Sequence, residues 1–167
     1  MVNSYFKYPI MFVALVLIQV MILNQIEFSG YANPYLYILF ILLLPSNAPR
    51  YVVLLSAFLI GITIDIFSGS MGIHASATVF IGYFRPFVIR VISVRDEEPA
   101  EYPGLSQNKF SWFLTYTSII VFLHHLMLFY LEIFTFRDFT DTFIRVVVSS
   151  FFSIFIIVLS QYIIFRK

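Results

Sequence analysis

Six stretches of the chain are almost continuously apolar, and short polar breaks separate them. They cover residues 8–23, 31–44, 51–67, 71–92, 110–136 and 143–165. A transmembrane helix needs about 20 apolar residues, and fewer where the bilayer thins locally. The strands of a transmembrane barrel would instead alternate apolar and polar positions. The pattern therefore predicts an all-α integral membrane protein, a single domain over residues 1–167, with six transmembrane helices.

The breaks contain residues that begin, end or turn helices. Pro34 is expected in the first turn of the second helix, where proline is tolerated. Pro45 and Pro49 bracket a turn before the third helix, and Gly69 lies in a turn after it. Residues 93–108 form the one sizeable hydrophilic loop. The second segment is the shortest, and a re-entrant segment remains the alternative to a spanning helix.

The basic residues divide unevenly between the two ends of the predicted helices. With six spans and a cytoplasmic N-terminus, the cytoplasmic side receives Lys7, Arg50, Arg90, Arg95, Lys109, Arg166 and Lys167. The outer side receives Arg137 and Arg145. Lysine and arginine concentrate in short cytoplasmic loops, so we expect both termini and the 93–108 loop in the cytoplasm. A second segment that did not span would split the basic residues across both faces.

Composition supports a membrane location and excludes several kinds of chemistry. Hydrophobic residues make up 60% of the chain and charged residues only 11%, whereas soluble domains carry about a quarter charged residues. The absence of cysteine excludes disulfides, thiolate metal sites and cysteine nucleophiles. The net charge of +1 produces no field that would attract nucleic acid.

One polar pattern lies in the hairpin between the third and fourth segments. Gly61, Asp65, Gly69, Gly72 and His74 follow the spacing Gly-x3-Asp-x3-Gly-x2-Gly-x-His. Small residues let helices approach closely, so we expect Gly61 and Gly72 at the closest contacts. Asp65 either caps the fourth helix or contacts a ligand or partner, and we favour the cap. Because asparagine also caps helices, Asp65→Asn is then expected to cost well under about 1 kcal/mol.

Four other polar residues fall inside predicted spans, where such groups normally face protein or water. Arg85 precedes Pro86, which is expected to interrupt the fourth helix, and a contact with lipid phosphates is preferred to an anion site. His124 and His125 point about 100° apart on a helix, and no histidine pair has zinc-site spacing, so we expect no metal. We interpret both as buried groups bonded to a neighbouring helix, with Glu132 on the face of His125.

Motifs for catalysis are absent from the sequence. It contains no Gly-x-Ser-x-Gly elbow, no His-Glu-x2-His and no phosphate-binding Gly-x4-Gly-Lys-Ser. The aromatic residues are better explained by packing and interface anchoring than by a cofactor site. The sequence therefore predicts a protein that is not an enzyme and has no cofactor.

The run GITIDIFSGSMGIH, from Gly61 to His74, resembles the signature of the MreD family of bacterial rod-shape proteins. The run FLHHLMLFYLE, from Phe122 to Glu132, is similar to the fifth helix of its members. The resemblance implies a non-catalytic subunit of the inner (cytoplasmic) membrane within the cell-elongation machinery, which supports rod shape and lateral peptidoglycan synthesis. Its implied partner is MreC, and through MreC it would be linked to MreB filaments and to the peptidoglycan polymerase and transpeptidase.

The MreD fold itself resembles the substrate-binding subunits of energy-coupling-factor vitamin transporters, which supplies an alternative function. Such a subunit would contact its transporter through small residues on the first and third helices. The third segment has Ala57 and Gly61, four residues apart, but the first offers only Ala14 among bulky residues. The transporter function therefore ranks second, and an enzyme of lipid or peptidoglycan chemistry ranks third.

Overall fold

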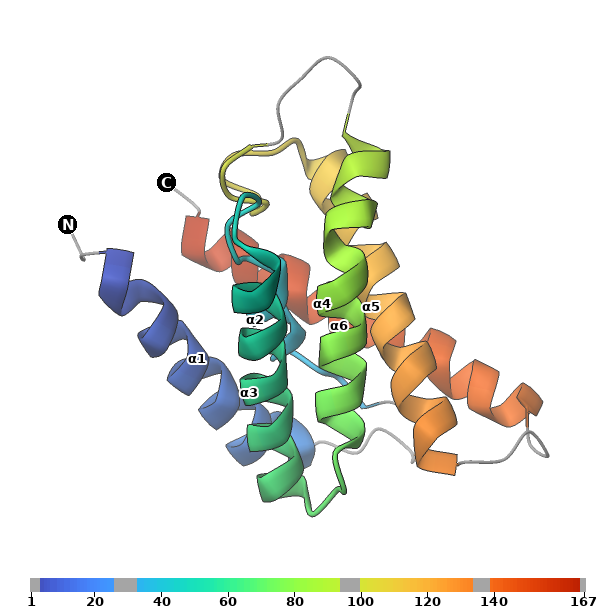
Figure 1. Cartoon of the computed structure of the whole chain (residues 1–167). Helices are drawn as coiled ribbons and strands as arrows, with labels where there is room; N and C mark the ends of the chain where they lie inside the picture. Colours follow the sequence, from blue (N-terminus) through green and yellow to red (C-terminus); the bar gives the residue numbers. More distant parts are fainter. Residues whose placement is uncertain (1–3, 26–32, 94–99, 134–138, 166–167) are drawn as a thin grey trace.

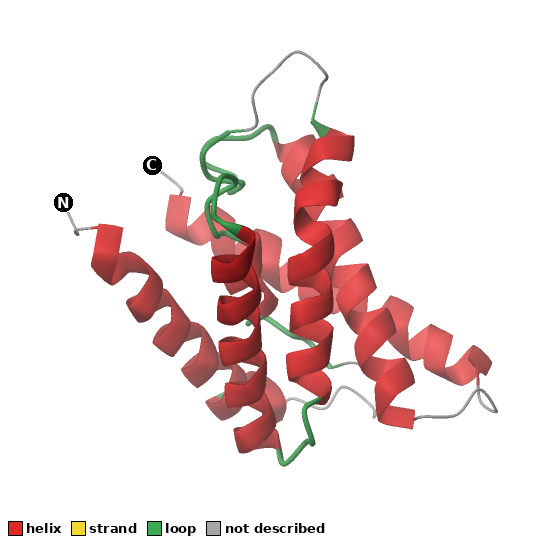
Figure 2. Cartoon of the chain, viewed as in Figure 1, coloured by secondary structure: helices red, strands yellow, loops and turns green. Residues whose placement is uncertain are grey.

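The chain folds into helices joined by short loops (Figures 1 and 2). The computed structural model describes residues 4–25, 33–93, 100–133 and 139–165. Its long helices are α1 (Ser4–Met21), α3 (Arg50–Ser68), α4 (Ile73–Ile92), α5 (Phe110–Ile133) and α6 (Phe139–Phe165). A short 3-10 helix, η1 (Leu23–Gln25), follows α1, and a short helix, α2 (Ile38–Leu42), precedes α3. No strand occurs among the described residues, which confirms the predicted all-α class.

The five long helices are each long and apolar enough to cross a membrane. Inside the protein, only 22% of the first span is buried, and at most 44% of any other. Most of the apolar surface on these helices is therefore left to contact lipid, which is the solvent that such a surface requires. The chain is a multi-pass membrane protein.

The helices run up and down in one bundle (Figure 1). From α3 to α6, each helix packs antiparallel against the next, and α1 packs against α3. The start of α1, the end of α6 and the loop before α5 lie at one end, which we call the terminal end. The turn between α3 and α4 lies at the other end, which we call the hairpin end.

The predicted second helix is wrong in its extent. Residues 33–37 are not helical, and the helix that follows has only five residues, Ile38–Leu42. All five of these side chains are buried, so α2 is surrounded by the other helices and does not face lipid. Residues 33–45, which we call the central segment, nevertheless run from the hairpin end toward the terminal end through the middle of the bundle (Figure 1).

Side chains of distant helices satisfy the non-helical backbone before α2. The Oε1 of Gln19 accepts the N–H of Leu36 at 2.8 Å, and its Nε2 donates to the carbonyl of Pro34 at 3.1 Å. On the opposite side, Ser149 accepts the N–H of Asn33 and Ser153 that of Tyr35, at 3.1 and 2.9 Å. Non-helical backbone at membrane depth is tolerated only when protein or water pairs its polar groups, and here the protein does so.

The other helix boundaries lie within four residues of the predicted ones, and α1 begins at Ser4, four residues before its predicted start. α6 begins at Phe139, four residues before the predicted start, while the predicted end of the fifth helix at 136 lies outside the described residues. The expected interruption at Pro86 is wrong, because α4 continues through it to Ile92. A proline removes only one backbone hydrogen bond of a helix. The packing of α3 and α5 against α4 holds the helix straight enough to continue past it.

Replacing Gln19 tests whether side-chain hydrogen bonds hold the central segment. Gln19→Leu keeps the size of this fully buried side chain but leaves the N–H of Leu36 and the carbonyl of Pro34 without a partner. We expect the free energy of unfolding in detergent micelles to fall by about 2–4 kcal/mol. Leu17→Ile, on the exposed face of α1, is the control. A Gln19→Leu protein within about 0.5 kcal/mol of wild type would contradict this role.

Candidate functional site

Asp65 joins the end of α3 to the start of α4. Its Oδ1 accepts the backbone N–H of His74 at 3.0 Å, and its Oδ2 accepts that of Ala75 at 2.9 Å. The hydroxyl of Ser70 donates to Oδ1 at 2.6 Å. The first N–H groups of a helix have no partner within the helix, so Asp65 caps α4 from the neighbouring helix. This is the structural role favoured from the sequence.

The two outer glycines of the hairpin motif act for different reasons. At Gly61 a Cβ would overlap Thr78 Oγ1 and the backbone of Ala75, so only glycine lets α3 approach α4 this closely. Gly72 has open space around it, and the expected close packing there is wrong. Its φ of 80°, like the 68° of Gly69, lies in the left-handed region that favours glycine. These two residues therefore shape the turn, while Gly61 sets the distance between the helices.

His74 places an imidazole between this cap and the protein interior. Its Nδ1 lies 3.0 Å from Oδ1 of Asp65, an arrangement in which Nδ1–H donates to the carboxylate. The lone pair of Nε2 is then left as an acceptor, with no partner among the described residues. Because His74 is only 8% exposed, its ring orientation is held by the carboxylate and by packing.

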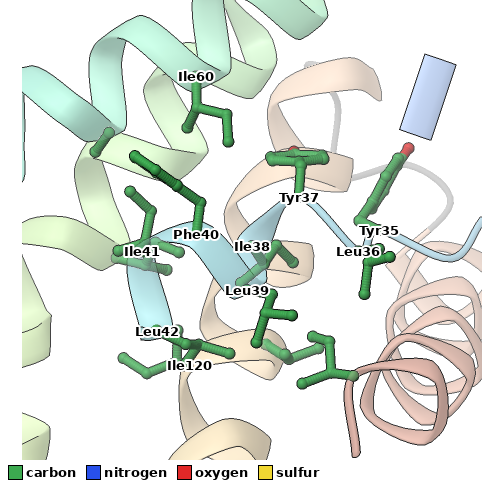
Figure 3. Packing of buried hydrophobic residues seen from close by; sticks show 14 of the residues in the cluster. Tyr35, Leu36, Tyr37, Ile38, Leu39, Phe40, Ile41, Leu42, Ile60 and Ile120 are labelled. Atoms are coloured by element: carbon green, nitrogen blue, oxygen red, sulfur yellow. The ribbon is translucent and has the colours of Figure 1, made fainter. Parts of the chain in front are cut away.

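Two tyrosines of the central segment bring the three histidines of the chain together. Tyr35 and Tyr37 point to the same side of the extended backbone, while Leu36 points away (Figure 3), as alternate residues do in an extended chain. The ring of Tyr35 lies 5.5 Å from that of His74 and 5.3 Å from that of His125, centre to centre. The sequence pattern did not single out these two tyrosines as candidate site residues.

His124 and His125 are fully buried and bond to different neighbours. The hydroxyl of Tyr37 lies 2.9 Å from Nε2 of His124. For His125, Nδ1 lies 2.8 Å from the carbonyl oxygen of Val121, so Nδ1 carries the proton. Its Nε2 must then accept the hydroxyl of Ser153 at 3.1 Å. Among the described residues, no group of three or more His, Cys, Asp or Glu side chains could hold a metal.

A cavity of about 370 Å³ opens beside this cluster at the hairpin end. Its lining is largely polar and comes from α1, η1, the central segment and the helices α3 to α6: Val20, Leu23, Asn24, Gln25, Asn33, Pro34, Tyr35, Phe67, Ser68, His74, Glu132 and Arg145. Small-molecule pockets usually measure about 300–1,000 Å³. The cavity is therefore large enough for a small polar ligand or for the tip of a partner side chain.

Glu132 and Arg145 form an ion pair at the edge of this cavity. Nη1 of Arg145 lies 3.1 Å from Oε2 of Glu132, and the guanidinium carbon lies 4.3 Å from the centre of the Phe129 ring. The Glu132 side chain is 41% exposed, so it contacts α6 and solvent and no contact joins it to the buried His125. The pair neutralises the charge of this wall.

Arg85 does not contact lipid as expected, because it is only 1% exposed. Its guanidinium donates to the carbonyls of Leu44 and Pro45, just after α2, and its Nε donates to the hydroxyl of Tyr116 at 2.9 Å. That hydroxyl donates to the carbonyl of Leu42 at 3.3 Å. Cations stabilise the free carbonyls at a helix end. Arg85 therefore takes no part in the hairpin motif. It holds the end of the central segment that lies after α2.

The cavity combines an oriented imidazole with groups that can bind a ligand. The Ser70 hydroxyl lies 3.0 Å from Nδ1 of this imidazole but donates to Asp65. A carboxylate that positions a histidine also occurs in acid–base catalysis. Here no serine, threonine or lysine of the described residues bonds to Nε2 of His74. The groups that line the cavity can donate hydrogen bonds to a bound group and accept hydrogen bonds from it.

Replacing Asp65 tests the cap, and the structure changes the expected cost. An asparagine has one oxygen, so its NH2 group would face the N–H of Ala75 or the donors that now meet Oδ1. We expect Asp65→Asn to lower the free energy of unfolding by about 1–3 kcal/mol, more than the sequence predicted. Unfolding in detergent micelles measures this, with Asp141→Asn at the exposed start of α6 as control. Equal stabilities of the two variants would contradict the cap.

No protein-family model matches this chain, and no curated protein or solved structure matches it either. What the chain does has to be inferred from its own residues and their geometry.

Proposed function

We propose that this chain is a non-catalytic subunit of the bacterial cell-elongation machinery, similar to MreD, that works through a partner similar to MreC. The observation that carries the proposal is the hairpin at residues 61–74. Each polar or glycine residue of the MreD-like motif has a specific task there: Gly61 sets the helix distance, Asp65 caps α4 and orients His74, and Gly69 and Gly72 form the turn. A motif matched by chance would not be expected to concentrate its residues in one interlocked unit.

The shape of the hairpin end suits a partner outside the membrane. Met71, at the tip, is 98% exposed, and Ile66 and Phe67 beside it are 72% and 63% exposed. The capped turn beneath them is rigid, because Asp65 and Ser70 bond it to both helices. Exposed apolar groups on a fixed frame are typical of protein interaction sites.

The proposal includes an orientation, with six crossings and both termini in the bacterial cytoplasm. Lys7, Arg50, Arg90 and Lys109 all belong to the terminal end (Figure 1), and the positive-inside rule assigns such an end to the cytoplasm. Residues 33–44 then make the second crossing as extended chain plus α2. The hairpin end and its cavity would face the outer side of the inner membrane.

The orientation is tested by single cysteines, since the natural chain has none. Met71→Cys at the hairpin tip should react with a membrane-impermeant maleimide on intact cells, because it would face outward. Ser106→Cys, on the exposed loop at the terminal end, should react only after the cells are opened. Labelling of Ser106→Cys in intact cells would overturn the orientation.

A second candidate, the substrate-binding subunit of an energy-coupling-factor vitamin transporter, is favoured by one observation. The polar cavity of about 370 Å³ at the hairpin end has the size of a small-molecule site. Against it, the α1 face offers few small residues for a transporter interface. Ala57 and Gly61, the small residues named on α3, are both buried against α4.

Isolation from native membranes separates the two functions. We expect the tagged chain to retain an MreC protein in a fixed ratio of the two proteins. Depletion of this chain should make rod-shaped cells round. Met71→Glu should abolish this retention at unchanged abundance, whereas Phe110→Glu, an equally drastic change at the terminal end, should not. Retention of a transporter ATPase with nanomolar vitamin affinity would favour the second candidate, and retention of neither protein would contradict both.

A further inference from the structure

A groove of about 450 Å³ separates α1 from α3 near the terminal end. Tyr8 of α1 forms one wall, Val52 and Ser56 of α3 form the other, and the buried Phe40 and Leu44 close the inner side. The lining is mostly apolar. Val52 in the groove wall is 36% exposed, and Leu55, one helical turn further along α3, is 58% exposed, so the groove opens toward lipid.

Two cations are the sequence neighbours of residues that line this groove. Lys7 precedes Tyr8, and its Nζ lies 4.9 Å from the centre of the Tyr102 ring and 5.8 Å from that of Tyr8. Arg50 directly follows Pro49, and both cationic side chains are exposed. The hydroxyl of Tyr8 is buried and has no hydrogen-bond partner among the described residues. An apolar groove thus has two exposed positive charges next to its lining residues.

We propose that this groove binds one acyl chain of a phospholipid whose anionic headgroup is held by Lys7 and Arg50. The charges match, because basic residues at the membrane surface attract anionic lipids. This site is independent of the hairpin end and of the function proposed above.

The acidic residue described near the groove does not cancel this attraction. Glu101 belongs to the loop that is tied to Ser46, whose N–H and hydroxyl donate to the carbonyls of Glu101 and Ala100 at 2.8 and 2.7 Å. Its carboxylate hydrogen-bonds to Tyr102 and raises the pKa of that phenol. Within the described part of this loop, one carboxylate thus stands against two cations.

A second apolar groove provides an internal comparison. It lies between α5 and α6, has a volume of about 480 Å³ and is lined by Ser118, Phe122, Val147 and neighbouring residues. No lysine, arginine or histidine contributes to its lining. A lipid in that groove would be held by its chains alone, without preference for its headgroup.

Native mass spectrometry of the whole protein tests the proposal. The protein is released from nanodiscs that contain equal amounts of phosphatidylglycerol and phosphatidylcholine. We expect the wild type to retain phosphatidylglycerol about tenfold over phosphatidylcholine, and the double variant Lys7→Gln, Arg50→Gln to retain both about equally. Arg90→Gln, an exposed cation at the same end of the bundle, is the control and should keep the preference.

Two further variants separate the groove from surface charge. Ser56→Phe should fill the groove and lower the number of retained lipids, whereas Ser118→Phe should leave the preference for phosphatidylglycerol unchanged. Glu101→Gln should increase that preference. A preference for phosphatidylglycerol that survives the double variant, or one that Arg90→Gln weakens equally, would overturn the proposal. Because Lys7 and Arg50 are exposed, this result does not depend on how well Ser56→Phe folds.

Discussion

The structure depends on pairing the polar backbone of a segment that crosses the bundle without being a full helix. Inside a membrane an unpaired N–H or C=O costs several kcal/mol, so residues 33–45 are possible only where other side chains reach them. Gln19, Ser149 and Ser153 serve the extended part, and Arg85 serves the carbonyls after α2. These side chains come from α1, α4 and α6, so the central segment fixes the positions of the helices around it.

The same constraint explains why the histidines are buried. Extended backbone sends Tyr35 and Tyr37 to one side (Figure 3), where their rings and hydroxyl groups need partners. His124 bonds to Tyr37, and His125 bonds to Ser153, which itself accepts the N–H of Tyr35. His125 thus supports the backbone of the central segment through one intermediate hydroxyl. A metal or proton-relay role is not needed to account for these residues.

The sequence predicted what depends on local patterns and missed what depends on distant partners. The five long helices follow from runs of apolar residues, and the hairpin follows from the spacing of Gly61, Asp65 and Gly72. The second helix was overestimated, because apolar residues such as Ile38 fit a buried, irregular segment as well as a lipid-facing helix. The signal that was available is Gln19, a polar side chain within the first span whose partner the sequence does not name.

Arg85 and Gly72 show the same limit at the level of single residues. An arginine near a helix end is compatible both with lipid phosphates and with backbone carbonyls, and only the position of α2 decides between them. A glycine is compatible with close packing and with positive φ, and Gly61 and Gly72 divide these two roles. In both cases the residue type defines a short set of possible interactions, and the fold selects one of them.

The two ends of the bundle differ in how they are held, which bears on where partners can bind. At the hairpin end, carboxylate, hydroxyl and imidazole groups lock the turn between α3 and α4. At the terminal end, α1 separates from α3, and its span is the least buried of the five. A protein partner gains affinity from a surface that is ordered before binding, whereas a lipid chain adapts to the wall that it meets. The locked end is therefore suited to a specific protein contact, and the open end to lipid.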